Sequence, residues 1–245
     1  MIITDCFWEK RNLGETVIEI SLEKEDKLDD KLLQKYNDID YVVVKVPINK
    51  FNCNYILGEN GYILSELQME MTAIMKDFNF NHKLIKWVYP HVEFKKVDGE
   101  DSLSEVLSKI DSSMFTTDRI SIDAHFGAEV GCNRYKNWIR DEYDKKKSEI
   151  IQFIYRGKHV GFMMYRESKI TRGLLGGVYP EYQSLGLGLL TPSALPLYIQ
   201  KNNLLASKIV ADISSNNKPV WELYESFGYK VTNSHYVFIK HNNNE

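Results

Sequence analysis

The chain has 245 residues with a formal net charge of −3, and this mild acidity disfavours a nucleic-acid-binding protein, which needs a strongly positive surface. Its three cysteines, Cys6, Cys53 and Cys132, lie far apart and form no CxxC pair, so neither a zinc site nor a disulfide framework is expected. No stretch approaches the roughly 20 apolar residues of a membrane span and the N-terminus lacks a secretion signal, so we expect a soluble, cytoplasmic protein without a metal or a membrane partner.

The first 110 residues mix short predicted strands with short predicted helices. Residues 41–46 (YVVVKV) form the clearest strand, because a β-branched run ends there at a proline. The other expected strands cover residues 17–20, 61–64 and 67–74, and the expected helices cover residues 28–36 and 103–110. A composition shift at Asp98-Gly99-Glu100-Asp101 leads us to place a domain boundary near residue 110. No internal repeat is visible.

The second half has a clearer order of elements, namely helix, three strands, helix, strand, helix and strand. Two apolar runs, 150–155 and 159–165, flank a Gly-containing turn and predict a β-hairpin. The other expected strands cover residues 170–178, 208–212 and 236–240, and the expected helices cover 135–147, 218–226 and a segment ending near 202. This order predicts an α/β protein with a mixed sheet flanked by helices.

A turn rich in small residues follows the strand that ends at Val178. It reads Gln183-Ser-Leu-Gly186-Leu-Gly188 and opens a helix. Such a turn can aim several backbone N–H groups at one point, where the helix dipole also favours negative charge. The pattern therefore indicates binding of a phosphate group, with a pyrophosphate favoured. The alternative is a turn that needs small residues only for packing.

A second motif lies downstream, from Asn217 to Tyr229 (NKPVWELYESFGY). Asn217 is placed to cap a helix, and Pro219 suits the first turn of that helix. Gly228 suits the turn that ends it. Tyr224 then lies on the helix, where an isolated tyrosine would be interpreted as a core residue.

Together the two motifs resemble the Gcn5-related N-acetyltransferase (GNAT) superfamily. Its phosphate loop reads Gln/Arg-x-x-Gly-x-Gly/Ala, and its later motif places a Tyr seven positions after an Asn. The resemblance covers roughly residues 115–240. It implies a GNAT fold in residues 111–245, beside a smaller α/β N-terminal domain in residues 1–110. It also implies an enzyme that transfers an acyl group from a coenzyme A thioester to an amine.

A looser resemblance points to the TDP-fucosamine type of acetyltransferase. It rests on Asp118-Arg119-Ile120 with Asp123 and Phe126, on Tyr135–Ile139 and on Val231–Tyr236. It implies that the acceptor is a dTDP-linked amino-dideoxy sugar used in surface polysaccharide or lipopolysaccharide synthesis, with residues 1–110 shaping the sugar-nucleotide site. Two alternatives remain open: a GNAT enzyme acting on a protein or small-molecule amine, and a non-catalytic protein that binds acyl-CoA.

The GNAT resemblance assigns roles to individual residues. Tyr224 is the expected acid for the leaving thiolate, since a tyrosine pKa of about 10 keeps its hydroxyl protonated at neutral pH. The expected coenzyme A contacts are Gly177, Val178, Gln183, Ser184, Leu185, Gly186, Leu187, Gly188, Leu189, Asn217 and Tyr224. Arg119, Asp123 and His125 are expected to contact the acceptor. The strand at 172–178 carries no acid, so no general base is identified there; Asp123 and His125 are candidates for that role, and water is the alternative acceptor of the amine proton.

Two prolines depart from this pattern. Pro196 cannot donate a hydrogen bond to the carbonyl of Pro192, and its ring clashes there, so a kink or break is expected in the helix behind the turn. Such a bend would enlarge the slot for the acyl chain. The donor would then be longer than acetyl, for example a hydroxybutyryl thioester.

Overall fold

The computed structural model describes residues 1–242, which form two compact units. Unit 1 consists of residues 1–69, 214–216 and 233–242, and unit 2 of residues 70–213 and 217–232. The boundary expected near residue 110 falls inside unit 2, between helices α5 (Glu100–Ser108) and α6 (Gly127–Asp144). Among the described residues, no helix combines the length and the apolar composition needed to cross a membrane.

Unit 1 contains a mixed sheet and three short helices. Its strands are β1 (Ile2–Asp5), β2 (Val17–Ser21), β3 (Tyr41–Pro47) and parts of β4 (Ile63–Ile74) and β10 (Lys230–His241). Its helices are α1 (Glu9–Leu13), α2 (Asp30–Gln34) and α3 (Phe51–Glu59). The strand order is β1-β2-β3-β10-β4, with β2 and β3 parallel. Val42, Val44 and Val46 share one face of β3 and pack against Leu57 of α3.

Unit 2 has the strand order β10-β4-β9-β8-β7-β6-β5. The strands not yet introduced are β5 (Val92–Lys96), β6 (Glu149–Tyr155), β7 (Lys158–Arg166), β8 (Ile170–Val178) and β9 (Lys208–Ser214). Besides α5 and α6, unit 2 contains the helices α4 (Lys83–Val88), α7 (Leu190–Lys201) and α8 (Lys218–Ser226). The mixed sheet confirms the predicted α/β class, and the predicted hairpin is β6–β7. The structure also contains β1, β5, α1, α3 and α4, which the sequence pattern did not predict.

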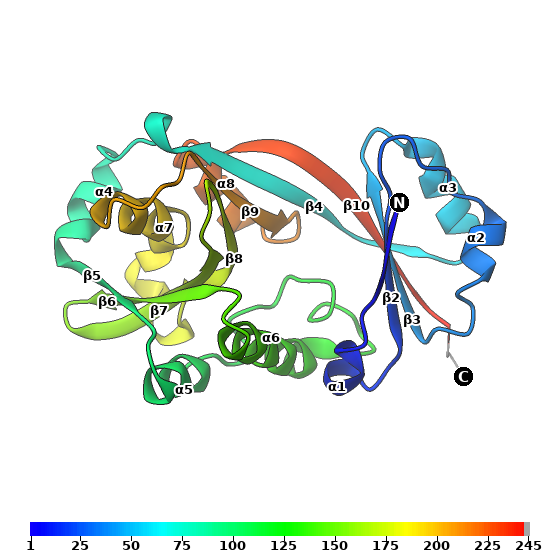
Figure 1. The fold of residues 1–245 in the computed structure, drawn as a ribbon, viewed down its shortest axis with the longest axis horizontal. Helices are drawn as coiled ribbons and strands as arrows, with labels where there is room; N and C mark the ends of the chain where they lie inside the picture. Colours follow the sequence, from blue (N-terminus) through cyan, green and yellow to red (C-terminus); the bar gives the residue numbers. More distant parts are fainter. Residues whose placement is uncertain (243–245) are drawn as a thin grey trace. The chain divides into compact units, whose positions relative to one another are not determined.

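The sheet of unit 2 is covered on both faces. On one face, α4, α7 and α8 contribute to a core that includes Leu195, Tyr224 and Phe227. On the other face, α5 and α6 pack their apolar residues against Phe162 and Met164 of β7. Figure 1 shows α7 and α8 away from α5 and α6 across these strands. Successive side chains of a strand point to opposite faces, so Met163 and Tyr165 of β7 lie in the first core, whereas Phe162 and Met164 lie in the second.

The two longest strands, β4 and β10, each run through both units (Figure 1). β4 belongs to unit 1 up to Met69 and to unit 2 from Glu70, whereas β10 passes from unit 2 to unit 1 after Thr232. In unit 1, β10 lies between β3 and β4, and in unit 2, β4 lies between β9 and β10. The sheet of each unit is therefore completed by a strand from the other half of the chain.

This exchange reveals an internal repeat, contrary to the expectation that the chain has none. The order β1-β2-β3-β10-β4 in unit 1 matches β7-β8-β9-β4-β10 in unit 2. A shift of 167 residues carries β3 onto β9, α3 onto α8 and β4 onto β10, with both ends of each element in agreement. The repeat is hidden in the sequence because few positions are identical. These are Val43 and Val210, Asn49 and Asn216, Gly61 and Gly228, and Tyr62 and Tyr229.

Gly161 on β7 fixes how closely β7 and β8 approach. It pairs with Val178, and a Cβ atom at Gly161 would overlap the carbonyl oxygen of Gly177. Replacing Gly161 by Ala is therefore expected to lower the free energy of unfolding by about 1–3 kcal/mol, the usual cost of overpacking. Urea unfolding would measure this loss. Gly173→Ala is the control, because its Cβ would meet its nearest atom at 3.7 Å. Equal losses in the two variants would contradict the prediction.

Candidate functional site

A β-bulge shapes the middle of β8. Its antiparallel pairing with β7 shifts register between Met164 and Tyr165, so that Leu175 faces Met164 and Gly173 faces Tyr165. Leu174 is the extra residue, and such a residue bends its strand and increases the local twist. The sequence pattern gave no signal for this bulge.

The two parallel strands β8 and β9 separate just beyond the bulged region. Their pairing runs from Ile170 with Lys208 to Gly173 with Ala211 and then stops, although β8 continues to Val178. Residues 174–178 therefore extend past the last β8–β9 pair, and their backbone groups on that edge have no partner in β9. We call this opening the fork.

The loop that follows β8 is built from two short 3₁₀ segments, Pro180–Leu185 and Leu187–Leu189, joined by Gly186. Gly186 has a φ of +70°, which L side chains rarely adopt, so a glycine is favoured there. The helix α7 then begins at Leu190. The first N–H groups of such segments have no acceptor within the helix, so they can bind an anion.

The residues of this loop divide into exposed and buried positions. Gln183, Ser184, Leu185 and Gly186 are exposed, whereas the side chains of Leu187 and Leu189 belong to the unit 2 core. The two buried leucines therefore anchor the exposed part of the loop to the core. The side-chain amide of Gln183 donates a hydrogen bond to the Val178 carbonyl at 3.4 Å, which ties the loop to the end of β8.

Tyr224 is buried on α8 and reaches the start of α7. Its hydroxyl donates to the Thr191 carbonyl at 3.4 Å, a long and therefore weak hydrogen bond. Its ring packs edge-on against Tyr229, with centroids 4.7 Å apart. Burial raises the pKa of Tyr224 above its usual value, so the hydroxyl is protonated at neutral pH.

The helix α7 continues through Pro196, so the expected break is absent. The reason is Tyr229, whose hydroxyl donates to the Pro192 carbonyl at 2.9 Å. That carbonyl would otherwise lack a donor, because Pro196 has no N–H. Tyr224 and Tyr229 thus donate hydrogen bonds to two successive carbonyls at the start of α7, those of Thr191 and Pro192. That the acyl donor is longer than acetyl stays a prediction.

Asn217 occupies the N-cap position of α8, but its side chain makes no capping hydrogen bond. The expectation of a side-chain cap is therefore wrong. Its backbone carbonyl accepts hydrogen bonds from Val220 and Trp221, which begins the helix without the side chain. The Asn217 amide is partly exposed.

Arg119, Asp123 and His125 all lie in the loop between α5 and α6. The Asp123 carboxylate accepts a hydrogen bond from the His125 N–H at 3.0 Å, so it shapes the turn before α6. Met114 of the same loop lies 3.3 Å from the position of a Cβ on Gly177. The loop therefore approaches the part of β8 that borders the fork, on which the coenzyme A contacts are expected.

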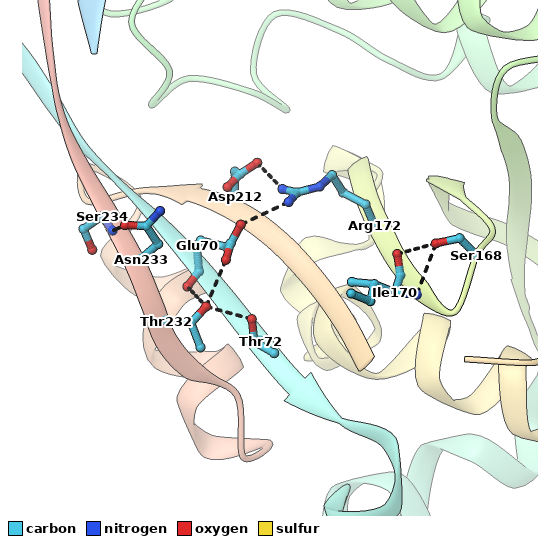
Figure 2. Close-up of polar contacts among 9 residues, drawn as sticks. All are labelled: Glu70, Thr72, Ser168, Ile170, Arg172, Asp212, Thr232, Asn233 and Ser234. Carbon is cyan, nitrogen blue, oxygen red and sulfur yellow. Dashed lines mark hydrogen bonds and ion pairs between the residues drawn. The ribbon is translucent and has the colours of Figure 1, made fainter. Parts of the chain in front are cut away.

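Sequence reasoning missed an ion-pair network at the closed end of the fork (Figure 2). Arg172 of β8 contacts Asp212 of β9 at 2.8 Å and Glu70 of β4 at 3.0 Å. Glu70 also accepts a hydrogen bond from Thr232 of β10 at 3.0 Å. These side chains are about a third exposed, so each pair adds little stability. The network links the four strands where β8 and β9 are still paired.

Comparison with known proteins rests on structure. No protein-family model matches the chain, and no curated protein matches it. A functionally unknown conserved protein from Staphylococcus epidermidis superposes with a TM-score of 0.64 at 14% identity, covering 93% of this chain and 84% of that one. A GCN5-related N-acetyltransferase from Kribbella flavida gives a TM-score of 0.56 at 12% identity, with coverage of 92% and 81%.

A GCN5-related N-acetyltransferase from Sphaerobacter thermophilus gives a TM-score of 0.56 at 11% identity. The match covers 82% of this chain but only 60% of that protein. These similarities show that the chain has the GNAT fold, which confirms the predicted fold class.

Proposed function

We propose that this protein is an N-acyltransferase that uses a coenzyme A thioester. The observation that carries this proposal is the fork between β8 and β9, which ends at the loop containing Gly186. The fork presents unpaired strand backbone, and the loop presents N–H groups at the start of a helix. An extended amide-containing arm attached to a pyrophosphate requires both features.

The residues of the site fit such a ligand. The backbone N–H groups of Leu185 to Leu189 would hold the pyrophosphate. A Cβ at Gly186 would meet nothing within 4 Å and one at Gly188 only Leu223 at 4.0 Å, so the loop is open around both residues. Gly177 and Val178 would pair with the pantetheine amides as an added strand, with Asn217 beside the arm.

The chain's residues would assist transfer in two ways. The amine nitrogen forms a bond to the thioester carbon, the carbon–sulfur bond breaks, and the nitrogen loses a proton to water. A backbone N–H near Val178 would stabilise the oxyanion, and Tyr224 would protonate the departing thiolate. To do so, its hydroxyl must leave the Thr191 carbonyl, which the 3.4 Å length of that bond favours.

The finer proposal concerns the acceptor, a dTDP-linked amino-dideoxy sugar for surface polysaccharide or lipopolysaccharide synthesis. Arg119, Asp123 and His125 would contact it, and the approach of their loop to Gly177 supports this. Residues 1–110 are proposed to shape the same site. A thiol-release assay with acetyl-CoA and longer acyl-CoAs, against dTDP-amino sugars, polyamines and lysine peptides, separates this acceptor from other amines.

Binding of coenzyme A provides the direct test of the site. Gly186→Glu is expected to weaken binding at least 100-fold, because it adds a negative charge and a strained side chain where the pyrophosphate would lie. Isothermal titration calorimetry would measure the affinity. The matched control is Gly157→Glu in the β6–β7 turn, where φ is +77° and a Cβ also meets nothing within 4 Å. Equal weakening in both variants, or no binding by the wild type, would refute the site.

A further inference from the structure

The repeat extends to β2 and β8. The parallel pairing starts with Val17 opposite Tyr41 in unit 1 and with Ile170 opposite Lys208 in unit 2. Counting from these pairs, Glu19 corresponds to Arg172 and Lys45 to Asp212. Both units form an ion pair at this place, at 2.9 Å and 2.8 Å, with the charges exchanged between the strands.

The helices that follow also correspond. Gly61 and Gly228 end α3 and α8 with φ values of +78° and +87°. The next N–H, of Tyr62 in one unit and Tyr229 in the other, donates to the carbonyl five residues earlier. The position of the proposed acid Tyr224 is occupied by Leu57 in unit 1, and that leucine is fully buried. Unit 1 thus keeps the backbone of the motif without its hydroxyl.

The fork has no counterpart in unit 1. β2 stays paired with β3 up to Ser21 opposite Lys45, and the N–H of Leu22 then donates to the Lys45 carbonyl at 2.9 Å. β2 therefore ends while it is still paired, whereas β8 continues for five residues beyond its last pair with β9. An added strand has no free edge to bind between β2 and β3.

In unit 1, the segment that corresponds to the phosphate loop is occupied by charged side chains of the chain itself. Residues 22–29 read LEKEDKLD and contain no glycine. The Asp26 carboxylate accepts from the Glu23 N–H at 2.6 Å, and the Asp29 carboxylate caps α2 by accepting from the Leu32 N–H at 2.8 Å. Lys50, at the position of Asn217, donates its ammonium to the carbonyls of Lys24 and Asp26. Carboxylates of the chain thus accept hydrogen bonds from backbone N–H groups of the kind that would bind a phosphate.

We infer that unit 1 is a second copy of the acyl-CoA-binding frame, closed by its own side chains, and that the chain binds one acyl-CoA, in unit 2. The identity of the ligand rests on the proposed function. The N-terminal copy keeps the strand topology but has no fork, no glycine loop and no counterpart of Tyr224.

The test counts coenzyme A molecules per chain, by calorimetry and by native mass spectrometry. The wild type is expected to bind one, and Gly186→Glu to bind none in the same concentration range. Asp29→Ala is expected to lower Tm by about 2–4 °C, because it removes a helix cap, while the Kd for coenzyme A changes less than about twofold. Cooperative thermal unfolding of each variant shows that it is folded.

Binding of two molecules by the wild type would overturn the inference. A tenfold change in Kd in folded Asp29→Ala would also overturn it, since that result places the ligand in unit 1. Absence of binding by the folded wild type would refute the proposed function instead. The two failures are therefore distinguishable.

Discussion

A chain that begins at residue 75 is expected not to fold, although it retains the phosphate loop, the fork and Tyr224. Residues 70–74 of β4 form the strand between β9 and β10 in unit 2. Met71 and Ala73 on this strand are 0% and 2% exposed in the unit 2 core. Losing a buried methionine alone costs about 2–5 kcal/mol, and the ladder hydrogen bonds are lost with it. This is comparable to the whole stability of a domain, about 5–15 kcal/mol.

Thermal unfolding followed by circular dichroism would check this expectation. The truncated chain should show no cooperative transition and no coenzyme A binding. Co-expression with residues 1–74 should restore both, because that fragment supplies β4. A truncated chain that melts cooperatively on its own would show that β4 is dispensable for unit 2.

Tyr224→Phe is expected to lower kcat by about 10- to 1,000-fold, the usual contribution of an acid–base group, with little change in the affinity for coenzyme A. The lost hydrogen bond to Thr191 is long, so stability should change little. Because burial raises the pKa of Tyr224, its proton is present throughout the neutral range. Steady-state rates of thiol release would measure the effect.

Tyr229→Phe is the matched control, since it removes a hydroxyl from the adjoining ring. It leaves the Pro192 carbonyl without a donor and should cost about 1–3 kcal/mol of stability, while kcat falls much less than in Tyr224→Phe. Unchanged turnover in Tyr224→Phe would remove this residue from the mechanism. Equal losses of activity in the two variants would assign both hydroxyls to packing.

The features that sequence reasoning found are local in the chain. The β6–β7 hairpin, the glycine loop and the α8 motif each depend on residues within about a dozen positions. The turn at Gly186 could be predicted because its left-handed backbone conformation favours a glycine. The absence of a break at Pro196 was not readable, because the compensating hydroxyl of Tyr229 lies 33 positions away in the sequence.

The pairing between strands that are distant in the chain could not be predicted from the sequence pattern either. β4 was predicted as two strands, 61–64 and 67–74, whereas it is one strand that two units share. A sheet partner encoded more than 100 residues away leaves no periodic signal in either segment. The repeat was not detected in the sequence for a related reason. Both copies keep apolar alternation and a turn glycine, whereas the polar residues that differ between them decide which copy has an open binding site.

The exchanged strands also have a consequence for biosynthesis. β10 follows every other strand in the chain, yet it lies between β3 and β4, two of the first strands to be made. Neither sheet can be completed on the ribosome before residues 230–241 emerge. The nascent chain therefore holds paired but unfinished sheet edges for most of its synthesis, the state in which newly made proteins aggregate most readily and depend most on chaperones.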